Sequence, residues 1–163
     1  MKATRIHTPS RLRRSLSRGM ATVEFALMAP LFLLLILGMT EAGHAFQVSG
    51  DLCAAVREGA RTASMDLSEV TSSTQTLNQK VTQDIRNFLS ANGIAGDRVT
   101  ITITHADSSA TFNLSDEANY LKSFRITASV PYSQVSRLPA DYLSGRTLSF
   151  SAVYRMGRSQ VTN

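Results

Sequence analysis

The feature that most constrains this chain is a run of twenty residues, from Met20 to Met39, that is dominated by hydrophobic side chains. A helix over this run would be about 30 Å long at about 1.5 Å per residue, which matches the hydrocarbon core of one bilayer. Residues 1–18 carry six basic residues and no acid, and such flanks stay on the cytoplasmic side of a membrane. We therefore expect a polar, disordered cytoplasmic leader over residues 1–19, a transmembrane helix over 20–42 and an extracytoplasmic domain over 43–163.

The basic charge of the chain is concentrated in this leader. The whole chain has 17 basic and 12 acidic residues, a formal net charge of +5, and residues 1–18 hold six of the basic ones. The remainder carries 11 basic and 12 acidic residues, so it has no basic excess. Because nucleic-acid-binding domains usually carry such an excess, the composition argues against nucleic acid as a partner.

One acidic residue, Glu24, lies near the start of the apolar run, five positions after Gly19. A charged side chain costs about 2.5–3.5 kcal/mol at the centre of a membrane and less near its edge, so this residue indicates a function and a partner. A pilin-type leader would explain it, because cleavage after Gly19 exposes an ammonium at Met20 and leaves the apolar helix intact. Glu24 would then pair with the Met20 ammonium of a neighbouring subunit and select the register between subunits.

Two other interpretations of the apolar run remain open. An uncleaved single-span anchor that presents an extracytoplasmic interaction domain would explain the length and the charge asymmetry, but it gives Glu24 no purpose. A secretory signal peptide would release a soluble domain, in the enzyme class a secreted hydrolase, that starts at Phe46. Gly43 and Ala45 fit the small-residue positions before such a cut, although the run exceeds the usual apolar length of about 7–15 residues.

The spacing of the apolar residues predicts an α+β fold. Residues 20–65 are expected to form one long helix, first transmembrane and then amphipathic, and a second helix is expected from about Leu67 to Ala91. From Arg98 onwards apolar and polar residues alternate, which indicates strands in a small antiparallel sheet covered on one face by the helices. The expected strands are Val99–Ile103, a short Thr111–Leu114, Phe124–Val130 closed by Pro131, and Leu148 to about Met156.

Small and apolar residues mark the expected contact faces of both helices. Cys53, the only cysteine, is expected to be a small buried residue rather than half of an intermolecular bridge. The residues expected on one face of the first helix, at three-, four- and seven-residue steps, are Phe46, Gly50, Cys53, Ala60 and Ala63. The expected apolar stripe of the second helix is Leu77, Val81, Ile85, Phe88 and Leu89, and Asn92-Gly93 is its expected stop.

No sequence motif points to catalysis, a metal or a cofactor. The three histidines, His7, His44 and His105, are scattered, and neither paired cysteines nor an acidic loop offers the spacing of metal ligands. Serines occur without a nucleophile motif or a neighbouring base. The densest charged segment is Arg57-Glu58-Gly59-Ala60-Arg61, whose glutamate and second arginine are three positions apart and can pair on a helix, as on any solvated helix face. We therefore expect a non-enzymatic protein.

The residues from Met20 to Phe46, MATVEFALMAPLFLLLILGMTEAGHAF, resemble the N-terminus of TadE-like proteins. An A-x-R-E-G-A-R segment follows the membrane helix in that family, and residues 55–61 have this pattern. The residues that coincide with the family pattern are Val23–Leu27, Pro30, the leucine run, Gly38 and Glu41, and Val130–Tyr132 and Ser151–Arg155 are similar to the family's C-terminal strands.

This resemblance implies a minor pseudopilin of the Tad (Flp-type) pilus system, with a pilin-like fold and a place in the bacterial inner membrane or at the base of the pilus. It implies cleavage between Gly19 and Met20 by a prepilin peptidase, with Glu24 as the acid that the recognition motif requires. Its other partners would be the major pilin, further pseudopilins and the inner-membrane pilus machinery, besides the lipid bilayer.

The same resemblance argues against a main filament subunit, because major Flp pilins are very short and have Tyr after the glutamate, where this chain has Phe25. TadE-type and related TadF-type roles both fit these residues. The family gives no role for Arg57, Glu58, Gly59 and Arg61.

Overall fold

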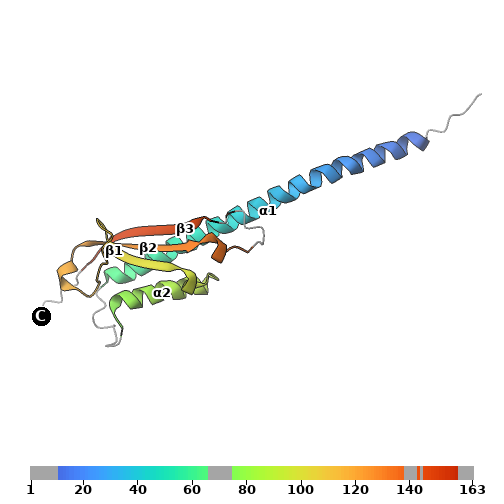
Figure 1. Cartoon of the computed structure of the whole chain (residues 1–163). Helices are drawn as coiled ribbons and strands as arrows, with labels where there is room; N and C mark the ends of the chain where they lie inside the picture. The colour runs from blue at the N-terminus through green and yellow to red at the C-terminus, as the bar shows by residue number, and fades with distance from the viewer. Residues whose placement is uncertain (1–10, 66–74, 138–142, 144, 158–163) are drawn as a thin grey trace, which may run out of the picture. The chain divides into compact units, whose positions relative to one another are not determined.

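The computed structural model describes residues 11–65, 75–137, 143 and 145–157 of the 163-residue chain. The chain divides into two compact units, Met1–Thr40 and Glu41–Asn163, and the long first helix contributes to both. Figure 1 shows this helix together with the elements of the second unit, which have the α+β arrangement expected from the sequence. The helices are α1 (Arg11–Ser64) and α2 (Leu77–Ala91), the strands are β1 (Thr100–His105), β2 (Ser123–Pro131) and β3 (Thr147–Arg155), and the single 3-10 turns are η1 (Gly96–Arg98), η2 (Glu117–Asn119) and η3 (Tyr132–Gln134).

The sheet is antiparallel, with strand order β1-β2-β3. Ile126 of the central strand pairs with Ile103 of β1 and with Ala152 of β3. Successive side chains of a strand point to opposite faces, and alternate residues of β2 are accordingly buried. Three of the four predicted strands are confirmed, with β2 ending at Pro131 as expected. The buried residues of β2 are Phe124, Ile126, Ala128 and Val130.

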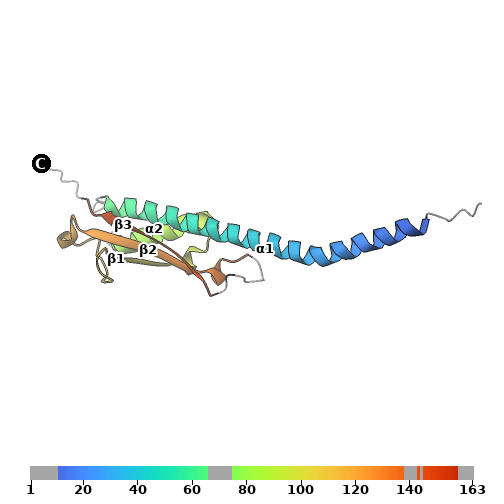
Figure 2. The same ribbon diagram turned by 90° about the horizontal axis from the view of Figure 1, so that it is seen from above.

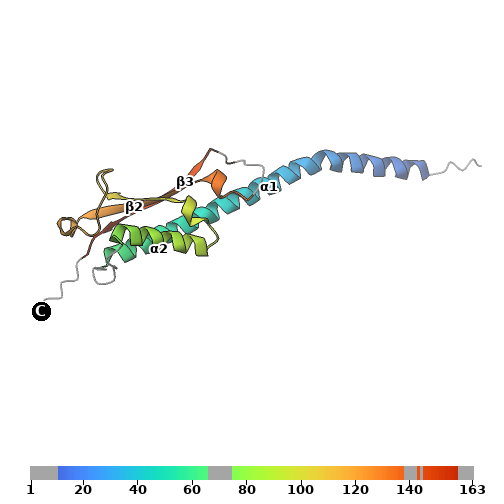
Figure 3. The same cartoon turned by 60° about the horizontal axis from the view of Figure 1, so that its bottom comes forward.

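Both helices of the second unit cover one face of the sheet. Figure 2 shows the C-terminal half of α1 running lengthwise along the strands, and Figure 3 shows α2 on the same side of the sheet. Buried side chains from α1, α2 and the inward face of β2 form one continuous apolar core. The largest fully buried side chains are Tyr132, Phe112 and Phe124. A single-sided core of this kind leaves the opposite face of the sheet to solvent.

The buried face of α1 differs in part from the predicted one. Ala60 and Ala63 are buried as expected, but Phe46 is 77% exposed, Gly50 is exposed and Cys53 is half-buried. The core takes a face that begins at Val48, two residues and therefore about 200° around the helix from Phe46. Apolar and small residues occur all round this part of α1, so their spacing alone did not identify the inward face. The buried apolar residues of α1 are Val48, Leu52, Ala55, Val56, Ala60 and Ala63.

Helix α2 begins at Leu77, because Thr76 caps it with a reciprocal capping box: its hydroxyl accepts from Gln79 N, and its own N–H donates to the Gln79 side chain. The expected start near Leu67 lies outside the described residues. The helix ends at the expected stop, where Gly93 has a φ of +82° that favours glycine. Four of the five predicted stripe residues, Leu77, Val81, Ile85 and Leu89, are buried, and Phe88 is half-buried.

Two predictions are wrong: the disorder of residues 11–19 and the short strand at 111–114. Helix α1 begins at Arg11, so residues 11–19 are helical. Leu and Arg are good helix formers, and extending an existing helix avoids the cost of nucleation. Residues 1–10, and most of the loop expected from Leu138 to Gly145, lie outside the described residues. Residues 111–114 form one isolated bridge, between Thr104 and Thr111, in place of the expected short strand.

The backbone of residues 112–114 forms hydrogen bonds with a side chain of α2. The Asn78 amide of α2 donates to Phe112 O at 2.7 Å, and its carbonyl oxygen accepts from Leu114 N at 2.9 Å. Both bonds use groups that a continuous strand ladder would need, so the segment stays irregular.

Candidate functional site

The apolar segment of α1 is solvent-exposed in the described structure. Its large hydrophobic side chains between Met20 and Met39 are all exposed, for example Leu27 at 75% and Phe25 at 72%. Among the described residues one helix, Gly19–Ser64, is long and apolar enough to cross a membrane, and none of its most apolar window is buried. A soluble core helix would bury such a window, so the segment fits single-pass membrane anchoring.

The three residues of the predicted processing site lie in one continuous stretch of α1. Gly19, Met20 and Glu24 are all exposed. Met20 and Glu24 are four positions apart and therefore share a helix face, whereas Gly19 lies about 140° around the helix from Glu24. The backbone before and after Gly19 is helical.

The Arg57–Arg61 segment has an outward and an inward part. On the outside, Arg61 binds Glu58 through two bonds, Nη2 to Oε1 at 2.7 Å and Nε to Oε2 at 3.1 Å, as predicted from their spacing. The hydrogen bond from Arg61 holds the pKa of Glu58 below its ordinary value of 4.5, and the same bond raises the pKa of Arg61. The Arg57 guanidinium lies 5.8 Å from the centre of the Phe150 ring on β3, at cation–π distance.

On the inside, Gly59 is the contact point between the two helices. A β-carbon at this position would overlap the Ile85 side chain of α2. Gly59 is therefore needed because α1 and α2 approach closely at this point, a reason that the sequence did not reveal.

Glu41 is a buried carboxylate at the first position of the second unit, and its burial was not expected from the sequence. Its side chain is 2% exposed, Ser136 Oγ donates to its Oε1 at 3.4 Å, and its Oε2 is buried without a hydrogen-bond partner. The Tyr132 hydroxyl donates to its backbone oxygen at 3.2 Å. The signal that could have identified it is an acid two positions after Met39, because a carboxylate so close to a membrane-length apolar run is costly unless it is hydrogen-bonded or paired.

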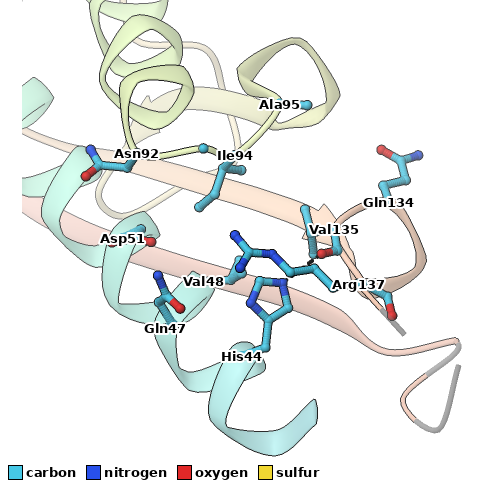
Figure 4. A pocket seen from close by; sticks show the side chains of 12 residues that line it. His44, Gln47, Val48, Asp51, Asn92, Ile94, Ala95, Gln134, Val135 and Arg137 are labelled. Atoms are coloured by element: carbon cyan, nitrogen blue, oxygen red, sulfur yellow. Dashed lines mark hydrogen bonds between the residues drawn. The ribbon is translucent and has the colours of Figure 1, made fainter. Parts of the chain in front are cut away.

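A small polar pocket lies next to this position in the second unit. It has a volume of about 180 Å³ and is formed by α1, by the turn after α2 and by the residues of η3 and just beyond it (Figure 4). His44 closes one side, where its Nε2 donates to Val135 O at 2.8 Å. The α1 residues that line it are His44, Gln47, Val48 and Asp51. In the sequence His44 is one of three scattered histidines; its spacing from Gln47 and Asp51, in steps of three and four residues, indicates a shared helix face and was the signal for this pocket.

The other two histidines are His7 and His105, for which the sequence predicted no ligand role. His105 packs edge-on against Phe112, with the ring centres 4.8 Å apart, and His7 lies outside the described residues. The described part of the chain contains no group of three His, Cys, Asp or Glu residues placed to hold a metal ion.

Residues 19–61 match the model of the family described as TadE-like protein. The match begins at the glycine before Met20 and ends at Arg61, so it includes the apolar segment, Glu24, Glu41 and the charged segment. The resemblance found in the sequence is thereby confirmed over this part of the chain. No curated protein and no solved structure gave a significant match.

Proposed function

We propose that this chain, with its TadE-like segment at residues 19–61, is a minor pseudopilin of a Tad/Flp-type pilus system, cut by a prepilin peptidase after Gly19. The observation that carries this proposal is the family match itself, which starts at Gly19, the residue before the proposed cut. The role is assembly, without catalysis, metal or cofactor. Its partners are the peptidase, other pilins and pseudopilins, and the inner-membrane pilus machinery.

The exposed apolar helix supports retention in the membrane after processing. Cleavage after Gly19 removes the basic leader and leaves Met20–Met39 intact, so the product stays anchored in the bacterial inner membrane. The basic charge of the removed segment supports a cytoplasmic N-terminus and an extracytoplasmic second unit.

Glu24 supports assembly through its charge. After processing, its carboxylate and the new Met20 ammonium are both costly to leave unpaired in lipid. Pairing between neighbouring subunits offsets much of this cost and favours one register of packed helices over its one-turn shifts. Inside one chain the two residues share a helix face, so the acid of one subunit and the ammonium of the next meet when the helices pack side by side.

Secretory cleavage after Ala45 is disfavoured by contacts of the second unit. Such a cut would remove Glu41, whose backbone oxygen accepts the Tyr132 hydroxyl, and His44, whose ring donates to Val135 O. The chain continues as α1 through this point into the core residues Val48 and Leu52. The domain would therefore lose part of its own helix on secretion.

The test is the mature N-terminus, determined by mass spectrometry of the chain purified from membranes of its native host. Met20 is the expected first residue, and deletion of the prepilin peptidase gene should restore the unprocessed mass. An intact leader in the presence of the peptidase would instead indicate an uncleaved anchor with an interaction domain. A start at Phe46 in a soluble fraction would mean a secreted domain and would overturn the proposal.

A further inference from the structure

The polar pocket between α1, the turn after α2 and η3 contains two charged side chains with no charged partner. Within the described part of the chain, neither the Asp51 carboxylate nor the Arg137 guanidinium makes a hydrogen bond or an ion pair. Figure 4 shows Asp51 below Asn92, and the Arg137 side chain extending over His44 and Val48 towards α1. The pocket therefore contains one anion and one cation that form no ion pair with each other.

Neutral polar groups line the same pocket. The Gln47 side chain lines the pocket from α1 and offers both a donor and an acceptor. A carbonyl oxygen can only accept, so the bond to Val135 O makes His44 Nε2 the donor and leaves Nδ1 facing away from that bond. With a volume of about 180 Å³ the pocket is smaller than a typical drug-sized site, and it suits one compact polar group.

We propose that this pocket binds a phosphoethanolamine group, the headgroup of phosphatidylethanolamine. A group that is itself a zwitterion matches a wall with one cation and one anion better than a simple anion does. The phosphate would accept charge-assisted hydrogen bonds from Arg137 and a bond from the Gln47 amide. The primary ammonium would donate to the Asp51 carboxylate.

The sequence position of the pocket favours a membrane lipid as the source of this group. This step rests on the proposed membrane anchoring of Met20–Met39. His44 follows Met39 by five residues along the same helix, which corresponds to about 8 Å of helical rise. The headgroup layer extends about 5–8 Å beyond the hydrocarbon core on each side, so His44 lies at the depth of the headgroups.

Two other phospholipids make sharp comparisons. Phosphatidylcholine has the same phosphate but a trimethylated nitrogen, which cannot donate a hydrogen bond to Asp51 and is bulkier. Phosphatidylglycerol has the phosphate but no cation. Contacts between the apolar helix and the acyl chains are common to all three lipids. The ratio of the amounts retained therefore reports the contribution of the headgroup alone.

The experiment is native mass spectrometry of the full chain in detergent micelles with equimolar phosphatidylethanolamine, phosphatidylcholine and phosphatidylglycerol of identical acyl chains. We expect the ethanolamine lipid to be retained about tenfold more than the choline lipid, the effect of one charge-assisted hydrogen bond. Asp51→Asn should reduce the ethanolamine lipid to the choline level. Arg137→Gln should reduce all three lipids, because it removes the contact to the shared phosphate.

Exposed charges outside the pocket give matched controls. Asp107→Asn and Arg146→Gln change the charge by the same amounts and should leave all lipid ratios unchanged. Equal retention of the ethanolamine and choline lipids by the unmodified chain, which needs no variant to fold, would overturn the proposal. So would an Asp51→Asn variant that keeps the preference.

A parallel titration with soluble O-phosphoethanolamine, followed by NMR of the His44 ring, separates the two sources of the group. Binding of the lipid at concentrations where the soluble compound leaves the ring signals unchanged supports the membrane source. Binding of soluble O-phosphoethanolamine without binding of the lipid would overturn the membrane source. A chain that stays with membranes but shows no lipid preference would refute the pocket assignment only, whereas a chain released from membranes would refute the anchoring.

Discussion

Gly59 of α1 lies directly against Ile85 of α2, with no room for a β-carbon between the two helices. Replacing Gly59 with Leu should destabilise the second unit by about 1–3 kcal/mol, because the added side chain forces Ile85 or the helix backbone to move. Thermal unfolding of the full chain in detergent, followed by circular dichroism, measures this change. The matched control is Gly50→Ala, because Gly50 is also helical but has nothing within 4 Å, and it should stabilise the helix by about 0.5–1 kcal/mol.

A double-mutant cycle distinguishes this contact from a general loss of helix quality. Ile85→Ala removes the atoms that Gly59 faces, so adding Gly59→Ala should cost less in that background than in the unmodified chain. Equal effects of Gly59→Ala in both backgrounds would show that the two residues are not coupled.

Asn78 joins α2 to the irregular segment at residues 112–114 through two hydrogen bonds. Asn78→Ala should destabilise the second unit by about 1–3 kcal/mol, since it leaves the Phe112 carbonyl and the Leu114 N–H without their partner. Asn78→Asp keeps the acceptor for Leu114 and should have an intermediate effect. Gln83→Ala, which removes an exposed side-chain amide from the same helix, is the control and should change the melting temperature little.

The ion pair of Glu58 and Arg61 predicts a titration below the ordinary range. The hydrogen bond from Arg61 lowers the pKa of Glu58, so its NMR titration midpoint should lie below 4.5 and should return towards that value in Arg61→Gln. A carboxyl group with a lowered folded-state pKa stabilises the fold above its unfolded pKa, and this contribution is lost as the pH falls through the folded value. Both side chains are exposed, so the accompanying change in melting temperature should be small.

Glu24 is predicted to act in assembly after cleavage. Glu24→Ala should lower the amount of the chain recovered with sheared pili by about tenfold, which corresponds to about 1.4 kcal/mol. Leu27→Ala, another exposed position of the apolar segment, is the control and should leave recovery near that of the unmodified chain. The mature N-terminus of each variant separates the two roles of the acid: a Glu24→Ala chain that is cut at Met20 but not assembled supports the register role.

Such a variant that assembles normally would remove the pairing hypothesis. One that remains uncut would place the effect of Glu24 on recognition by the peptidase instead. An uncut variant would still agree with cleavage after Gly19, but it would limit the role of Glu24 to recognition by the peptidase.

The spacing of apolar residues predicted the buried face correctly in elements whose other face is clearly polar. The stripe of α2 and the alternation of β2 belong to this group, because polar residues fill the other positions and only one face can enter the core. The face of α1 was misassigned because Phe46 and Val48 are both apolar and only the sheet decides between them. Residues 111–114 alternate like a strand, yet the Asn78 side chain takes their backbone groups.

By itself, the sequence determined the exposed membrane-length helix, the asymmetry of charge before it, the acid at Glu24 and the α+β class. These follow from local composition and spacing, which act over a few residues and need no knowledge of the fold. Only the tertiary structure decided why position 59 must be glycine, why Glu41 is buried, and that His44, Gln47 and Asp51 share a pocket with Arg137. Each of these depends on residues more than twenty positions away in the chain, and such contacts arise only when the helices and the sheet pack together.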